Sequence, residues 1–412
     1  MPDTPTESPA KNSPDSFSPN VAKRTLLASL VSVGMGFTVL FPVLAPLGRE
    51  MGLSEVQITT VIAASGLMVF LFSPFWGRRS DQWGRKAVLL IGMFGFSAGT
   101  LLFNSVLYVG LSGWLTGTAL FVALVLARMT HATMMSASMP AANALMADLT
   151  DASNRTKGMG AAAAASNIGS ILGPAVASLA VVSLLTPLWV MAAVALLNGL
   201  FVWRFLPELP RQSVPAVSRR MRYSDPRIVP FVIVGVAMFT GMGLVQQTMG
   251  FRFQDALGLS AEETAINFGL AMMLSGLGSL FSQLVIVQRL RVAPFTLLRF
   301  AMPLMVIAFL MMALLETQTA LTVAMVIMGM GTGLAGPGFT AGASLAVGPS
   351  EQGAVAGVAG SCGPLGFTLG PAIGGVMYQF SPTLPYAFAA GLFLLLLVSM
   401  QWLARRVVVH TE

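Results

Sequence analysis

Long hydrophobic stretches alternate with short polar segments along almost the entire chain. Most stretches hold about 20 apolar residues, enough for an α-helix to cross the hydrocarbon core of a membrane. A longer polar segment at 206–227 separates six stretches from six more. They lie at about 24–47, 59–77, 87–108, 117–147, 157–182 and 187–205, then at about 228–251, 264–287, 293–314, 319–346, 353–379 and 384–404. The pattern predicts an all-α membrane protein with twelve transmembrane helices in two six-helix bundles.

The polar segments complete the predicted domain organisation. Residues 1–22 hold five prolines among Ser, Thr, Asp and Asn, a composition that cannot bury a core, so we predict a disordered cytoplasmic tail. We expect an N-terminal bundle at 23–205, a cytoplasmic linker at 206–227, a C-terminal bundle at 228–405 and a short cytoplasmic tail at 406–412.

Composition excludes a soluble protein, because only 9% of the residues are charged, against roughly 25% in a soluble domain. A single cysteine, Cys362, cannot form an internal disulfide, and two histidines are too few for a histidine-rich metal site. We therefore expect no metal and no cofactor.

The positive charges predict the orientation. Most of the 23 Lys and Arg residues fall in the segments that share a side with the N-terminus. Cytoplasmic loops carry such an excess, so we expect both termini in the cytoplasm and a multi-pass protein of the cell inner membrane. The net charge of +7 is explained in this way without a nucleic-acid partner.

The two halves of the chain repeat three short motifs in the same order. Gly34-Met-Gly matches Gly241-Met-Gly, Gly52-Leu-Ser matches Gly258-Leu-Ser, and a Gly-x-x-x-Gly-Pro motif recurs in the fifth and eleventh spans. Two parallel repeats of this kind enclose a cavity near the middle of the membrane, an arrangement suited to alternating access.

The loop after the second span reads GRRSDQWGRK over residues 77–86. It resembles the G-x-x-x-D-x-x-G-R-[RK] signature of the major facilitator superfamily, and this resemblance implies the major facilitator fold. Gly77 and Gly84 permit tight turning and close helix approach, and Asp81 can hold the N-terminus of a nearby helix. The resemblance implies that this acid steadies the outward-open state by contacting span 11. We predict a conformational latch of Gly77, Asp81, Gly84, Arg85 and Lys86.

The fifth and eleventh spans resemble the G-x-x-x-G-P-x-x-G-G motif of the twelve-span drug:proton antiporters. Span 11 carries the full form, whereas span 5 has Ala177-Ser178 in place of the last two glycines. Glycines four residues apart allow close helix packing and proline bends a helix. The predicted packing residues are Gly169, Gly173, Pro174, Gly366, Gly370, Pro371, Gly374 and Gly375.

Four ionisable residues in or after span 4 are candidates for coupling or for the cavity: Arg128, His131, Asp148 and Arg155. This span is similar to the fourth span of tetracycline exporters. Arg128 and His131 share one helical face, and charged groups at membrane depth indicate function. A histidine can carry a proton at physiological pH. The alternatives are a neutral, hydrogen-bonded His131 and a purely structural Arg128.

The span-1 carboxylate of the tetracycline exporters is absent, because aligning the shared glycines places Val33 at its position. Asp148 is the only acid expected inside a span. Proton coupling by the family's route therefore lacks its carrier, and a dry cavity without acids disfavours cationic substrates.

Polar side chains at membrane depth are candidates for substrate binding, with hydrogen bonds between helices as the alternative. They are Thr38, Asn143, Asn167, Gln246, Gln247 and Asn267.

These features predict a secondary active transporter, not an enzyme, that exports hydrophobic small molecules or drugs in exchange for protons by alternating access. Its partners are the lipid bilayer, a small-molecule substrate and protons, and we expect a monomer. The alternative is a transporter, including an importer, of neutral or anionic compounds such as a metal chelate or an organic acid. A membrane-bound sensor and a membrane enzyme lack supporting motifs.

Overall fold

The computed structural model describes residues 19–151, 154–208, 221–290, 292–348 and 351–409. Every regular element within these ranges is a helix, so the predicted all-α class is confirmed. The predicted tail up to residue 18, the middle of the predicted linker (209–220) and residues 410–412 lie outside the description. The first helix begins at Pro19, four residues before the predicted start of the first bundle.

The first half of the chain forms the helices α1 (Pro19–Thr38), α2 (Leu40–Glu50), α3 (Glu55–Trp83), α4 (Arg85–Leu111), α5 (Gly117–Met135), α6 (Ser138–Asp148), α7 (Arg155–Val176) and α8 (Thr186–Phe205), with a 3₁₀ turn η1 (Ala177–Val181) after α7. The second half forms α9 (Val229–Leu257), α10 (Ala261–Phe281), a π-helical turn η2 (Ser282–Val287), α11 (Gln288–Leu290), α12 (Pro294–Leu314), α13 (Gln318–Leu345), α14 (Gln352–Phe380) and α15 (Leu384–Val409).

Ten helical segments within the described ranges are long and apolar enough to cross a membrane. Consecutive helices such as α1 and α2, or α5 and α6, count as one segment. The long helices α14 and α15 are not among the ten. The many glycines of α14 lower its hydropathy.

Proline divides two of these segments. Pro42 and Pro140 have no amide hydrogen to donate to the carbonyl four residues earlier. The helices break at these places, between Thr38 and Leu40 and between Met135 and Ser138. Both breaks lie beside the cavities described below.

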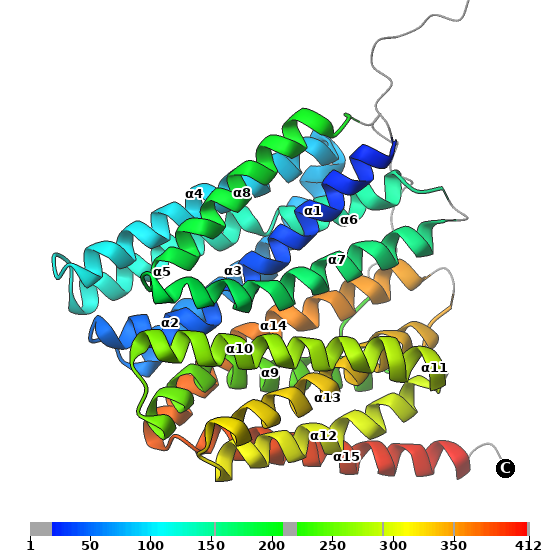
Figure 1. The fold of residues 1–412 in the computed structure, drawn as a ribbon. Coiled ribbons are helices and arrows are strands. Elements are labelled where there is room, and N and C mark those ends of the chain that lie inside the picture. Colours follow the sequence, from blue (N-terminus) through cyan, green and yellow to red (C-terminus); the bar gives the residue numbers. More distant parts are fainter. Residues whose placement is uncertain (1–18, 152–153, 209–220, 291, 349–350, 410–412) are drawn as a thin grey trace, which may run out of the picture.

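The two halves of the chain occupy opposite sides of the molecule (Figure 1). Within the first half α1 packs against α7, and α4 packs against α5 and α8; within the second, α9 packs against α14, and α13 against α12 and α10. Across the boundary α3 packs against α14, and α7 against α10. The matched helix pairs α1–α7 and α9–α14 carry the repeated glycine motifs.

The halves also repeat one local structure after their first span. Gly52 and Gly258 both have positive φ, of 72° and 63°, which glycine adopts without strain. Ser54 and Ser260 follow as N-caps, and each forms a capping box with the residue three positions later. The sequence repeat thus specifies the same turn and helix start twice.

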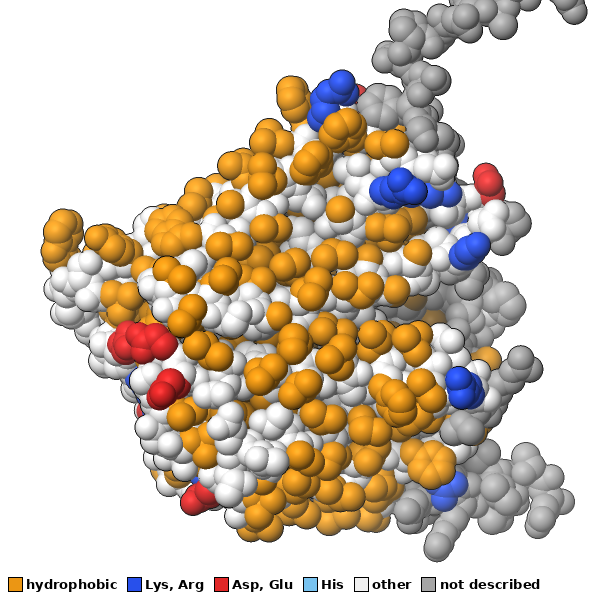
Figure 2. Space-filling view, viewed as in Figure 1, with side chains coloured by type: hydrophobic (Ala, Val, Ile, Leu, Met, Phe, Trp, Pro, Cys, Tyr) orange, Lys and Arg blue, Asp and Glu red, His pale blue; other side chains and the backbone are white. Residues whose placement is uncertain are grey.

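Charged side chains gather at the two ends of the molecule. On the face shown in Figure 2, acidic side chains collect mostly at one end and Lys and Arg side chains at the other, with a broad hydrophobic band between them. We call the end that carries Arg79, Arg85 and Lys86 the basic end, and the end that carries Glu55 and Asp255 the acidic end.

Candidate functional site

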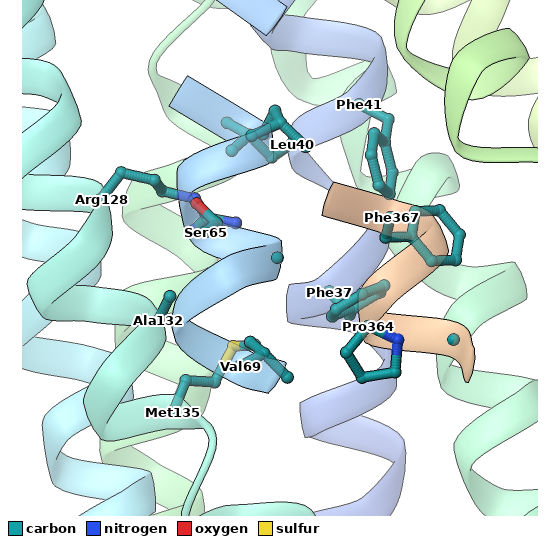
Figure 3. Close-up of a pocket in the computed structure, with 13 residues that line it drawn as sticks. Phe37, Leu40, Phe41, Ser65, Val69, Arg128, Ala132, Met135, Pro364 and Phe367 are labelled. Carbon is teal, nitrogen blue, oxygen red and sulfur yellow. The ribbon is translucent and has the colours of Figure 1, made fainter. Parts of the chain in front are cut away.

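A cavity of about 190 Å³, the central cavity, lies between the two halves. The rings of Phe37, Phe41 and Phe367 approach it from the break between α1 and α2 and from α14 (Figure 3). The Phe37 and Phe367 ring centres are 5.8 Å apart, so aromatic contact joins the two halves here. Opposite these rings, α3 contributes Ser65 and α5 contributes Arg128. The cavity is apolar except at this one side.

A larger cavity of about 610 Å³, the entrance cavity, adjoins the central cavity on the side of the basic end. The two cavities share Phe37, Val69, Met135 and Pro364. The first turns of α14 line the entrance cavity loosely, because a Cβ added at Gly357 would meet no atom within 4 Å. The entrance cavity therefore lies between the central cavity and the basic end.

A third cavity, the polar cavity, has a volume of about 210 Å³ and lies between α1, α7, α9, α10 and α13. Three of the predicted substrate-binding residues line it: Thr38, Asn167 and Gln246. A fourth, Asn143, lines the entrance cavity instead. The structure thus divides these four residues between two cavities.

The remaining two predicted substrate-binding residues line none of these cavities. Gln247 is completely buried, and neither atom of its side-chain amide has a hydrogen-bond partner within the described residues. Asn267 accepts a hydrogen bond of 2.8 Å from Gln318 Nε2, which ties α10 to the start of α13. Spacing along the helices alone did not show that Gln247 and Asn267 lie on helix faces away from these cavities.

Arg128 and His131 form a buried pair on α5. The guanidinium Nη1 lies 2.6 Å from His131 Nδ1, and His131 Nε2 lies 3.2 Å from Thr100 Oγ1. Because arginine only donates, Nδ1 accepts and the proton of the neutral imidazole is on Nε2. A second proton on the ring would face the Arg128 cation at hydrogen-bond distance. Of the two alternatives for His131, the geometry of this structure matches the neutral, hydrogen-bonded ring.

The predicted latch residues lie at the basic end. Asp81 forms an ion pair with Arg85, and Arg85 Nε lies 3.2 Å from Asp148 Oδ2. Asp148, which was predicted to act in coupling, therefore contacts Arg85 of the predicted latch and not Arg128. No hydrogen bond or ion pair between Asp81 and α14 occurs within the described residues, which differs from the expected role at span 11. This difference is consistent with a structure that is open at the basic end.

The other residues of that loop have separate roles. Gly84 has a φ of 101° and lets the chain turn between α3 and α4. A Cβ at Gly77 would meet no atom within 4 Å, so the close helix approach expected there is absent in this structure. Lys86 is half-buried in the first turn of α4, and Arg155 is exposed at the start of α7.

The glycines of the two packing motifs lie at close backbone contacts. A Cβ at Gly169 would lie 2.1 Å from Val31 O, and one at Gly173 would lie 2.4 Å from Met35 O. In the second half, a Cβ at Gly370 would lie 2.4 Å from Thr240 O. Gly366 and Gly374 also face α9, whereas Gly375 faces α3, where an added Cβ would lie 1.9 Å from Thr59 Oγ1. Pro174 and Pro371 lie inside α7 and α14.

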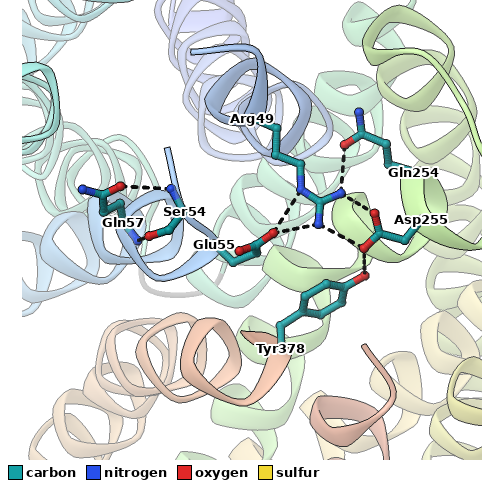
Figure 4. A network of polar contacts seen from close by, with 7 residues as sticks. All are labelled: Arg49, Ser54, Glu55, Gln57, Gln254, Asp255 and Tyr378. Atoms are coloured by element: carbon teal, nitrogen blue, oxygen red, sulfur yellow. Dashed lines mark hydrogen bonds and ion pairs between the residues drawn. The ribbon is translucent and has the colours of Figure 1, made fainter. Parts of the chain in front are cut away.

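An ion-pair cluster closes the acidic end (Figure 4). Arg49 of α2 contacts Glu55 of α3 at 2.8 Å and both carboxylate oxygens of Asp255 on α9. Tyr378 of α14 donates a hydrogen bond of 2.7 Å to Asp255. Arg49 therefore joins the first half of the chain to the second. In the sequence, the only sign of this contact was that Arg49 lies alone at the end of span 1, outside the predicted cytoplasmic segments.

The sequence model of the Major Facilitator Superfamily matches residues 26–367 of this chain. The chain belongs to the Major Facilitator Superfamily. It is therefore a multi-pass membrane transporter and not an enzyme, as predicted. Membership in this superfamily also makes the lipid bilayer and a small-molecule substrate its partners.

Two relatives of the chain have names that refer to drug resistance. Multidrug resistance protein 1 of Bacillus subtilis is 25% identical over 381 residues, which cover 90% of this chain and 93% of that protein. The Quinolone resistance protein NorA of Staphylococcus aureus is 27% identical over 147 residues, or 36% of this chain and 34% of that protein. The predicted resemblance to drug-efflux members of the superfamily is confirmed.

Solved structures show the same fold. The nucleoside transporter NupG superposes with a TM-score of 0.73 at 13% identity, covering 92% of this chain and 99% of that one. The Major Facilitator fold places the three cavities between the two halves of the chain.

Proposed function

We propose that this superfamily member is a secondary active transporter that exports hydrophobic small molecules across the bacterial inner membrane by alternating access. In this proposal α14 and α15 also cross the membrane, which gives twelve spans in two six-helix bundles. Residues 23–205 and 228–405 form the bundles, with residues 206–227 as the linker. Both termini lie in the cytoplasm.

The apolar central cavity carries the proposal. Rings from both halves of the chain line it, so a bound molecule contacts both halves at once. Flexible Met135 and the aromatic rings suit hydrophobic ligands of different shapes. Because relative motion of the halves must remake these contacts, binding and conformational change are coupled at this cavity.

The charges support the direction of transport. Cytoplasmic loops of membrane proteins are rich in Lys and Arg, so the basic end faces the cytoplasm in this proposal. The entrance cavity then opens toward the cytoplasm, and the Arg49 cluster closes the outer end. A molecule from the cytoplasm or the inner leaflet reaches the central cavity in this state, as loading of an exporter requires.

The proposal includes proton exchange, which the resemblance to drug:proton antiporters implies. No carboxylate lines the central, entrance or polar cavity within the described residues. Asp148 is engaged by Arg85. In this proposal the proton carrier is an acid outside the cavities, and the candidates are Asp148, paired with Arg85, and Glu55 and Asp255, both paired with Arg49.

The test is transport of Nile red, a neutral hydrophobic dye, in inside-out vesicles with an imposed pH gradient. We expect the dye to accumulate in vesicles that contain the protein, and accumulation to stop when an ionophore collapses the gradient. Phe367→Ala should slow accumulation, whereas the matched change Phe300→Ala, at an exposed ring on α12, should not. Accumulation that ignores the gradient contradicts proton exchange, and no accumulation contradicts export.

Import of neutral or anionic compounds is the second candidate, and Arg128 in the cavity favours it. Right-side-out vesicles distinguish the two candidates. Uptake that is faster than in protein-free vesicles, together with no accumulation in inside-out vesicles, would support import.

A further inference from the structure

Among the residues that the structure describes, Arg128 is the only charged one that lines the central cavity. Its side chain extends from α5 toward Ser65 on α3, across the cavity from Phe41 and Phe367 (Figure 3). Only 8% of the residue is exposed. A buried guanidinium stays charged and needs a partner, since an uncompensated charge in an apolar interior is costly.

The structure provides that partner only in part. Arg128 Nη1 donates to His131 Nδ1, and the guanidinium carbon lies 5.7 Å from the ring centre of Phe103. Nε has no hydrogen-bond partner, and no carboxylate forms an ion pair with Arg128 among the residues that the structure describes. By contrast, Arg49, Arg85 and Arg252 each pair with a carboxylate.

His131 acts as a positioning residue. It receives the Nη1 hydrogen bond and is itself anchored to Thr100, so one edge of the guanidinium is fixed. No other donor of the planar group forms a hydrogen bond within the described residues. Guanidinium donors match the geometry of a carboxylate, and such pairs are often bidentate.

We propose that the central cavity binds hydrophobic aromatic carboxylates. The ligand carboxylate supplies the counter-charge that Arg128 lacks, and the ligand ring lies against Phe37, Phe41 and Phe367. This inference rests on the proposed transport function and names the substrate class of the same cavity. A cationic ligand of equal size is disfavoured, because it would place a second buried positive charge beside Arg128.

The test uses three ligands of nearly the same shape: naphthoate, naphthamide and naphthamidine, which are anionic, neutral and cationic at pH 7. Binding to the purified full-length protein in lipid nanodiscs is measured by calorimetry. We expect naphthoate to bind at least about tenfold more tightly than naphthamide, as a charge-assisted hydrogen bond provides. Naphthamidine should bind most weakly. Equal or reversed affinities, or no binding of naphthoate, would overturn the proposal.

Variants connect the preference to Arg128. Arg128→Gln should bind naphthoate and naphthamide within about threefold of each other, because the charge-assisted bond is lost. Arg299→Gln, at an exposed arginine of α12, is the matched control and should keep the wild-type preference. An unchanged preference in Arg128→Gln overturns the proposal.

A second variant leaves Arg128 in place. Ser65 lines the cavity near the guanidinium, and its hydroxyl bonds only to its own helix, at Val61 O. Ser65→Asp provides a resident carboxylate, so the preference for naphthoate should disappear and naphthamidine should bind more tightly than in the wild type. If Arg128→Gln fails to fold, Ser65→Asp tests the proposal alone. A naphthoate preference that is retained in Ser65→Asp refutes the role of Arg128.

The Nile red assay separates this inference from the proposed function. Accumulation of Nile red by a protein that does not prefer naphthoate would refute the substrate class and leave export standing. Tight, Arg128-dependent naphthoate binding by a protein that accumulates neither compound would support the site and refute export.

Discussion

Removing the contact between Arg49 and Asp255 should shift the protein toward a state that is open at the acidic end. Asp255→Asn keeps the shape of the side chain and its bond to Tyr378, and Arg49 keeps Glu55. The change therefore weakens the link between the two halves without leaving Arg49 unpaired. The prediction concerns the balance between two states and not the stability of either half.

The size of the shift follows from the geometry. The Arg49 and Asp255 side chains are 22% and 35% exposed, so water screens the ion pair in part. An exposed pair contributes at most about 1 kcal/mol, whereas a charge-assisted, bidentate contact reaches roughly 3 kcal/mol. We take about 1–2 kcal/mol for this intermediate case, which changes the ratio of the two states by a factor of roughly 5–30.

Spin labels report this ratio directly. Labels at Trp114 and Leu314 place one probe on each half, both at exposed positions at the acidic end, while the buried Cys362 remains unlabelled. Double electron–electron resonance should show a larger population with long label-to-label distances in Asp255→Asn than in the wild type. Glu316→Gln is the control, because it removes an ion pair with Arg252 that lies wholly within the second half. Identical distance distributions in Asp255→Asn and the wild type would refute the reasoning.

Three further predictions use other contacts. Gly375→Ala should hold the acidic end open, because the new Cβ would lie 1.9 Å from Thr59 Oγ1. Adding Thr59→Gly to this variant should restore closure in the same distance measurement. Failure of this rescue would contradict the contact. His131→Gln should leave the pH profile of transport between pH 5 and 8 unchanged, since Nδ1 already accepts a hydrogen bond from Arg128 and has no place for a second proton; a shifted profile would count against the assigned tautomer. Arg227 donates a hydrogen bond of 2.8 Å to Glu351 and lowers the pKa of that carboxyl. The ion pair therefore stabilises the fold at neutral pH. This stabilisation is lost as the pH falls below the ordinary pKa of a glutamate and then through the lowered pKa of Glu351. Melting temperatures of Glu351→Gln should therefore be below those of the wild type at pH 7 and approach them near pH 3; a constant difference would show that the effect is not the ion pair.

The sequence predicted the helices well, because a membrane leaves the backbone few alternatives to a helix. The pattern did not locate the breaks at Thr38 and Met135, although Pro42 and Pro140 explain both once the carbonyls four residues earlier are considered. Helix ends were likewise shifted by a few residues, as at Pro19.

The candidate site was predicted less completely. Arg128 was identified because a charge at membrane depth is conspicuous, and its neighbour His131 follows from helical spacing. Asn267 matches the alternative of a hydrogen bond between helices, because a polar side chain can face another helix as well as a cavity. The Arg49–Asp255 contact was missed, because no pattern within one span shows which helix ends meet across the two halves.

The backbone contacts at Gly173 and Gly370 also determine how the protein can acquire new substrates. Any side chain at either position would collide with a neighbouring main chain, so these positions tolerate almost no variation. The rings of Phe37, Phe41 and Phe367 border the central cavity, where a change in ring size alters the space for a ligand and the ring contacts between the halves. Under selection by an unfamiliar compound, substitutions that alter the substrate range are accordingly expected to accumulate at the rings, while the helix pairs that carry them stay fixed.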